Sequence, residues 1–270
     1  MSDKLSSMRY AGRVNLAAIN WGFHHAKPGK TLAEVDAVIE DYIRKAGCVP
    51  AFKNYQPEGY PLPFPATACI SPNDVVVHGI PGDYVLENGD LLTIDVGTQH
   101  EGWFVDAARS RVIRSESRMT RRQLDRCFLA QKLVDATEAI LEAQLSVIKN
   151  DCDFLTIVRA AEEEAAARGV TIMHQWGGHG IADRIHMDPF IPNALDRTKP
   201  LLTQNLEKRR LSQQKLTTGQ TICVEPVTTF GSPDIIIDDD QWTIRQTEGK
   251  LAAHSERCLL VTEDGYELLS

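Results

Sequence analysis

Four carboxylates and one imidazole are notable because each lies beside glycine or within an apolar, strand-like run. They are Asp95, Asp106, His179, Glu225 and Glu256. If these groups are buried together they need compensating positive charge, because an unpaired buried charge is costly. A pair of divalent metal ions would supply that charge, and this ligand set suits hard or borderline metals rather than a thiolate zinc site. The sequence therefore predicts a dinuclear metal centre, provided that the five residues converge.

The two aspartates lie in neighbouring segments, residues 91–97 and 102–109, that are expected to form a β-hairpin. Aspartate is depleted inside strands, although it also ends strands and caps turns. A turn centred on His100-Glu101 would place Asp95 directly opposite Asp106. Facing carboxylates repel each other across a ladder, and a metal between them would convert the repulsion into a binding site.

The other three candidates are distinguished by their immediate neighbours. His179 has glycine on both sides, which would allow close approach to a metal, although a histidine in a glycine-rich turn is also common. Glu225 ends an apolar run before a proline, which is unusual for a solvated residue. Glu256 precedes another apolar run, and its alternative role is an ion pair with Arg257 or a charge at a strand edge.

The remaining histidines differ in context. His78 follows three valines and precedes a Gly-Ile-Pro turn, and His186 follows His179 by seven residues, so that a turn between them would direct both into one cleft. The acidic run 238–240 is expected to be a solvated turn rather than a metal site. The histidines expected on the surface, because they lack such surroundings, are His24, His25 and His254.

The elements that must position these residues are helices and short strands. Residues 7–23 form a weakly amphipathic stretch, and Thr31 and Glu34 can form a capping box for a helix that Gly47 ends. Helical patterns cover residues 118–149, with Thr120 and Gln123 as an internal capping box, and residues 154–168. Residues 50–65 contain five prolines and are expected to be irregular. Residues 194–217 are expected to be an exposed loop or short surface helix. Strands are expected at 68–70, 75–77, 170–173, 221–227, 234–237, 243–246 and 257–262. This order favours an α+β fold, in which helices cover one side of an antiparallel sheet, in one domain of residues 1–270.

Composition restricts the class of protein. Of the 270 residues, 43% are hydrophobic and 24% are charged, which is ordinary for a globular protein with a substantial core. The net charge of −8 argues against general nucleic-acid binding. Residues 1–10 are polar, and no apolar run approaches the ~20 residues of a membrane span. The six cysteines form no Cys-x-x-Cys pair and are typical of reduced cysteines in a cytoplasmic protein.

A set of short motifs follows one another from about residue 5 to the C-terminus. They are His-Gly-Ile-Pro at 78–81, Asp-Leu-Leu-Thr-Ile-Asp-Val-Gly at 90–97, residues 102–106, Gly-His-Gly-Ile at 178–181, residues 185–189, Ile-Cys-Val-Glu-Pro at 222–226, Trp-Thr at 242–243, Ser-Glu at 255–256 and Val-Thr-Glu-Asp-Gly at 261–265. In this order they resemble the motifs of type I methionine aminopeptidases, which have the pita-bread fold.

The resemblance implies a ligand set for two divalent ions, of Mn, Fe, Co or Zn. Asp95 would bind one metal, His179 and Glu225 would complete the second, and Asp106 and Glu256 would bridge both. A water or hydroxide between the metals would attack the scissile carbonyl.

The resemblance also implies roles around the metals. Glu225 would act as general base, His186 would support the carbonyl oxygen as charge develops, and His78 would contact the nitrogen of the scissile bond. The free α-amine of the substrate would bind a metal, which explains exopeptidase action. The methionine pocket would include Phe64, Cys69 and Trp242, an apolar and sulfur-tolerant set.

The expected activity is removal of the initiator methionine from nascent polypeptides by a cytoplasmic monomer. We expect neither a membrane nor a specific nucleic acid as partner, and the ribosome is left open as a partner. Three departures from the family pattern bear on this expectation: Ile185 replaces an aromatic residue, Met187 an acidic one, and Arg257 adjoins a bridging carboxylate. The alternatives are a divergent pita-bread paralogue with another peptide substrate, such as X-Pro, and a non-catalytic peptide- or ribosome-binding member.

Overall fold

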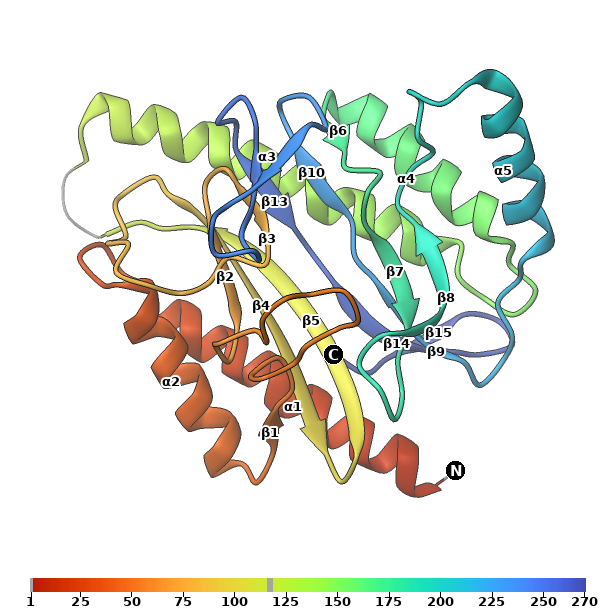
Figure 1. Cartoon of the computed structure of the whole chain (residues 1–270), viewed down its shortest axis with the longest axis horizontal. Coiled ribbons are helices and arrows are strands. Elements are labelled where there is room, and N and C mark those ends of the chain that lie inside the picture. The colour runs from red at the N-terminus through yellow and green to blue at the C-terminus, as the bar shows by residue number, and fades with distance from the viewer. Residues whose placement is uncertain (1, 116–118) are drawn as a thin grey trace.

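A computed structural model describes residues 2–115 and 119–270 of the protein. Along these residues, two helices precede the first five strands, two more precede the next three, and a fifth precedes the last seven (Figure 1). The helices in this part of the chain are α1 (Ser2–His25), α2 (Leu32–Lys45), α3 (Arg121–Ser146), α4 (Phe154–Arg168) and α5 (Leu201–Gln213). None of the helices in these residues is both long and apolar enough to cross a membrane.

The helix boundaries follow local capping chemistry. Thr31 caps α2 with Glu34 in the predicted capping box, and Gly47, at φ 73°, follows the end of α2. Helix α4 has the predicted bounds. Thr120 and Gln123 also form a capping box, but Thr120 is the N-cap of α3 itself, so the internal position predicted for it was wrong. The start predicted at Arg118 lies outside the described residues.

The strands form four sheets, and every strand pair in the described residues is antiparallel. In the first sheet β4 (Leu91–His100) pairs with β1 (Val49–Pro50), β2 (Cys69–Pro72) and β5 (Trp103–Val112). The second has the order β13 (Ala252–His254), β10 (Val227–Thr229), β6 (Thr171–Ile172). The third has the order β11 (Ile235–Ile237), β12 (Ile244–Gln246), β3 (Val75–Val77). The fourth has the order β15 (Tyr266–Leu268), β14 (Arg257–Val261), β9 (Thr221–Val224), β7 (Gly177–Gly180), β8 (Met187–Pro192).

The helices pack behind the strands in two groups. Figure 1 shows β4 and β5 crossing in front of α1, and β10 and β13 crossing in front of α3. One core joins α1 and α2 to β2 and β4, through residues such as Ile19, Ile39 and Ile94. A second core joins α3, α4 and α5 to β9 and β14. Within residues 2–115 and 119–270, this arrangement leaves the side of the strands that carries the predicted ligands free of helices.

The β4–β5 hairpin differs from its predicted register. Asp106 lies opposite Gly97 and Asp95 opposite Ala108, so the direct Asp95–Asp106 pairing was wrong. The turn falls one residue later than expected, at Glu101-Gly102, where both residues have positive φ as a type I′ turn requires. The resulting shift of two residues keeps both carboxylates on the same face of the sheet, as diagonal neighbours.

Two further differences concern segments around the predicted ligands. The strand expected at residues 221–227 is interrupted at Glu225-Pro226 and continues as β10. The glycines around His179 form the strand β7 rather than a turn, and β7 lies between β8 and β9. A Cβ on Gly178 would lie 2.2 Å from the carbonyl oxygen of Cys223, so glycine is required for this close approach. The segment 194–217 contains α5, in agreement with the surface-helix alternative.

Candidate metal centre

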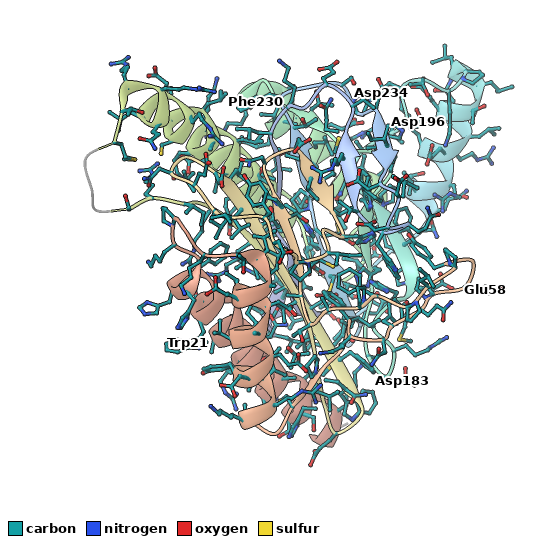
Figure 2. The ribbon with its side chains drawn as sticks, turned by 60° about the vertical axis from the view of Figure 1, so that its left-hand side comes forward. Trp21, Glu58, Asp183, Asp196, Phe230 and Asp234 are labelled. Atoms are coloured by element: carbon teal, nitrogen blue, oxygen red, sulfur yellow. The ribbon has the colours of Figure 1, made fainter. Side chains whose placement is uncertain are left out.

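A cavity of about 620 Å³ lies on the helix-free side of the strands. The ten predicted site residues all line it: Phe64, Cys69, His78, Asp95, Asp106, His179, His186, Glu225, Trp242 and Glu256. Figure 2 labels Glu58 and Asp183 on one flank of the molecule. Each of them directly adjoins in sequence a residue that lines the cavity, Pro57 or Arg184. Segments far apart in sequence therefore contribute to one chamber.

The five predicted ligands come from different strands and converge. Asp95 lies on β4, Asp106 on β5 and His179 on β7, whereas Glu225 follows β9 and Glu256 precedes β14. Ligand atoms of Asp95, Asp106 and Glu256 lie within 4.8 Å of one another. The Nε2 atom of His179 is 3.8 Å from Glu225 Oε1 and 3.9 Å from Glu256 Oε1. The structure brings the five groups together, and their role as ligands stays a prediction.

The carboxylates of this cluster are electrostatically unfavourable by themselves. Burial raises the pKa of Asp106 to about 7, and burial together with neighbouring carboxylates raises the pKa of Asp95, Glu225 and Glu256 well above the usual range. In the described residues, one buried oxygen each of Asp95, Asp106 and Glu256 has no hydrogen-bond partner. Buried carboxylate oxygens without donors fit divalent cations, which would supply both the charge and the missing contacts.

The tautomer of His179 also fits a metal. Its Nδ1 lies 3.0 Å from the carbonyl oxygen of Gly180, which can only accept, so Nδ1 carries the proton and donates it there. The unprotonated Nε2 then faces Glu225 and Glu256, and burial lowers the pKa of the ring. Histidine ligands of metals are commonly fixed in this way, by a hydrogen bond from the other ring nitrogen.

His78 and His186 approach the same centre from its rim. His78 follows β3 at φ 57°, and burial lowers its pKa to about 4. The ring of His186 lies 4.6 Å from the ring of His179, and its Nδ1 is 3.0 Å from the hydroxyl of Tyr55. Tyr55 comes from the proline-containing loop, where sequence patterns gave no sign that it contacts the site.

Arg257 does not form the ion pair with Glu256 that the sequence left open. Its guanidinium donates to the backbone carbonyl of Glu256 at 2.9 Å and lies 3.8 Å from the carboxylate of Glu138. Adjacent side chains on a strand point to opposite faces, so the Glu256 carboxylate faces the cavity while Arg257 extends toward α3.

His254 was predicted to be a surface residue, and this was wrong. It is 3% exposed, lines the cavity, and its Nε2 lies 3.6 Å from Glu225 Oε2. Burial lowers its pKa to about 3. The small apolar residues Ala252 and Ala253 that precede it were the available signal for a buried strand, and the pairing of β13 with β10 places it in the site.

Aromatic side chains form the opposite wall of the cavity. Trp242 stacks on Tyr60 at a centroid distance of 4.4 Å and meets Phe64 edge to face at 5.2 Å. Its indole Nε1 donates to the carbonyl of Leu62 at 3.1 Å, which ties it to the loop. Asp240 accepts from the backbone of Trp242, so the acidic run 238–240 holds this turn rather than a metal.

Cys69 lies between the acidic cluster and the aromatic wall. It lies opposite Asp95 in the pairing of β2 with β4 and packs in the same core as Phe64 and Trp242. Burial and the neighbouring carboxylates raise the pKa of its thiol well above the usual range, so it is a neutral, polarisable surface.

The chain matches the model of metallopeptidase family M24 over residues 6–263, and it belongs to this family. Its fold is the pita-bread fold of that family.

Similarity extends over nearly the whole chain. A methionine aminopeptidase of Mycoplasma capricolum is 31% identical over 99% of this chain and 96% of its own length. Methionine aminopeptidase 1 of Mycobacterium tuberculosis is 33% identical over 100% of this chain and 93% of its own. The crystal structure of a methionine aminopeptidase from Thermotoga maritima superposes with a TM-score of 0.83 at 26% identity, covering 100% of this chain and 97% of that one.

Proposed function

We propose that this M24 metallopeptidase is a methionine aminopeptidase that hydrolyses the first peptide bond of polypeptides beginning with Met. The observation that carries the proposal is the composition of the cavity, in which an acidic cluster with one fixed imidazole adjoins an aromatic and thiol-lined wall. The acidic cluster with its imidazole suits metal-assisted hydrolysis, and the aromatic and thiol-lined wall suits a thioether side chain. The similarity to methionine aminopeptidases over nearly the full chain supports the same activity.

The cluster would hold two divalent ions: Asp95 would bind one of them, His179 and Glu225 the other, and Asp106 and Glu256 would contribute to both. When bound, such ions, whether Mn, Fe, Co or Zn, lower the pKa of water and polarise the scissile carbonyl. All five ligands are held by strands or by strand ends, so their positions are set before substrate arrives.

The protein side chains would handle the substrate and its protons. Glu225 would accept the proton of the attacking water and transfer it to the leaving amine. His186 would donate a hydrogen bond to the carbonyl oxygen as negative charge develops, and His78 would contact the nitrogen of the scissile bond. The side chain of the substrate methionine would pack against Phe64, Cys69 and Trp242.

We further propose that the whole of residues 1–270 forms one catalytic domain that acts in the cytoplasm as a monomer on nascent N-termini. Two observations support this placement. The relatives match over nearly all of the chain, and the six cysteines are buried and free, as in reducing compartments.

The test compares peptides in metal-stripped protein reloaded with Mn or Co. We expect release of Met from Met-Ala-Ser, little from a Met-Pro-Lys peptide, and no release of Leu from Leu-Ala-Ser. Hydrolysis that prefers the Met-Pro or another bond would indicate a divergent substrate. Binding of two metals without hydrolysis of any peptide would contradict the proposed activity, and failure to bind metal would favour a non-catalytic peptide- or ribosome-binding role.

A further inference from the structure

Four imidazoles line the cavity, and the roles described above use only three of them. The fourth, His254, lies at the end of β13 and is 3% exposed. Its Nε2 is buried and has no hydrogen-bond partner among the described residues. A buried ring nitrogen without a partner is unfavourable. We therefore expect this side chain to have a role in the site.

The backbone of His254 is firmly held. Its N–H donates to the hydroxyl of Ser110 at 3.0 Å, and the same hydroxyl donates to its carbonyl at 2.8 Å. Strand pairing places His254 directly opposite Val227, two residues after Glu225. The imidazole is therefore directed at Glu225 by the register of β13 and β10.

The Glu225 carboxylate lies between two imidazoles. Its Oε1 is 3.8 Å from Nε2 of His179, and its Oε2 is 3.6 Å from Nε2 of His254. The backbone carbonyl of Glu225 accepts a hydrogen bond from Asn193 at 2.9 Å, so the backbone is fixed as well. A small rotation of the carboxylate would bring Oε2 within hydrogen-bond distance of His254.

His254 is not placed as a metal ligand. The groups of three or more ligand atoms found within 4.8 Å of one another in the described residues include His179, His186 and Cys223 but not His254. The ion-pair contact found for it among the described residues is with Oε2 of Glu225. Outer groups of this kind orient the residues that act directly.

We propose that His254 is a positioning residue for Glu225. Its Nε2–H donates to Oε2 of Glu225 and fixes the plane of the carboxylate, which holds this carboxylate ready to accept the proton of the attacking water. The inference rests on the proposed function, in which Glu225 is the proton acceptor, and it adds a residue that keeps the acceptor in its reactive orientation.

The kinetic test uses His254→Leu, His254→Gln and, as control, His24→Gln on the exposed face of α1. In the metal-loaded full chain, we expect His254→Leu to lower kcat for Met-Ala-Ser about 10- to 100-fold, with KM within about twofold and two metals still bound. His254→Gln should recover much of kcat, because its amide N–H can donate in place of the imidazole. His24→Gln should match the wild type.

A second measurement does not depend on turnover. In protein labelled with ¹⁵N-histidine, the Nε2–H of His254, assigned by its absence in His254→Gln, should give a downfield resonance typical of a hydrogen bond to a carboxylate. That resonance should move upfield in Glu225→Gln. Circular dichroism and thermal unfolding of each variant verify that the fold is retained.

Three outcomes would overturn the inference: an unchanged kcat in His254→Leu, loss of a metal from that variant, which would make His254 a ligand, or an Nε2–H resonance that does not move in Glu225→Gln. Failure of the proposed function is distinct from these, since the wild type itself would then release no Met, whereas the resonance would still report on the His254–Glu225 contact.

Discussion

The two walls of the cavity are built in different ways. The acidic wall stands on paired strands: Asp95 and Asp106 lie in one hairpin, and Glu256 hydrogen-bonds through its backbone N–H to the carbonyl of Ala108 in that hairpin. The aromatic wall stands on the segment between β1 and β2, where Tyr60 and Phe64 pack against Trp242 and the backbone N–H of Phe64 donates to the carbonyl of Tyr55.

The two walls therefore meet different structural requirements. Metal geometry tolerates little displacement, so the proposed ligands are expected on strands or at strand ends, where ladder hydrogen bonds fix the backbone. A binding pocket for an apolar side chain depends on surface and volume, which a loop can supply and change without moving the ligands. Substitutions in the acidic wall should therefore abolish function, and those in the aromatic wall should tune it.

The largest effect is expected at the bridging positions. Asp106→Asn or Glu256→Gln should remove metal retention and turnover together, because each carboxylate would contact both ions. Metal content by mass spectrometry and Met release from Met-Ala-Ser measure the two effects. Asp239→Asn, in the exposed acidic turn, is the matched control and should change neither. Full turnover with bound metal in either bridging variant would contradict the ligand assignment.

A smaller effect is expected for a residue beside the acidic wall that would contact the substrate but not the metals. His78→Ala should keep both metals and lower kcat by about 100-fold, the usual scale for one lost hydrogen bond to a reacting group. Metal titration by calorimetry, run beside the kinetics, tests the separation. Loss of metal in His78→Ala would show that His78 is a ligand and that the ligand set is wrong.

The aromatic wall should respond through selectivity. Trp242→Ala removes a side chain that is 5% exposed, and loss of ~1.5–3 kcal/mol of apolar contact corresponds to roughly a 10- to 100-fold fall in kcat/KM for Met-Ala-Ser, with metal content unchanged. Trp21→Ala is the control, because Trp21 is 41% exposed and lies on the flank opposite Glu58 and Asp183 in Figure 2. A fall in metal content in Trp242→Ala would contradict the independence of the two walls.

The smallest effect is expected where the walls meet. Tyr55→Phe removes only the hydroxyl that lies 3.0 Å from His186 Nδ1. One hydrogen bond contributes a net ~0.5–1.5 kcal/mol, so kcat should fall about two- to tenfold with KM little changed. Steady-state kinetics on Met-Ala-Ser measures it, with Tyr10→Phe on α1 as control. A loss as large as that of His78→Ala would mean that the loop takes part in the chemistry and not only in substrate selection.

The sequence alone determined the features that depend on neighbours along the chain. The capping box at Thr31 and Glu34 satisfies helix N–H groups within one turn, so it needs no tertiary partner. Residues 154–168 carry their own start and stop signals, and α4 has those bounds. The five candidate ligands were recognisable because aspartate and glutamate in apolar runs, and a histidine between glycines, are unfavourable without a site to occupy.

The tertiary structure alone decided the features that depend on partners distant in sequence. The hairpin register differs by two residues from the predicted one, because the turn falls at Glu101-Gly102, where both residues adopt the positive φ of a type I′ turn. Pairing of β13 with β10 buried His254 beside Glu225, although His254 was predicted to lie on the surface. Tyr55 reached His186 from an aperiodic loop. Local sequence sets which residues are costly to bury, whereas strand register and loop path set where they meet, because those contacts join residues far apart in the chain.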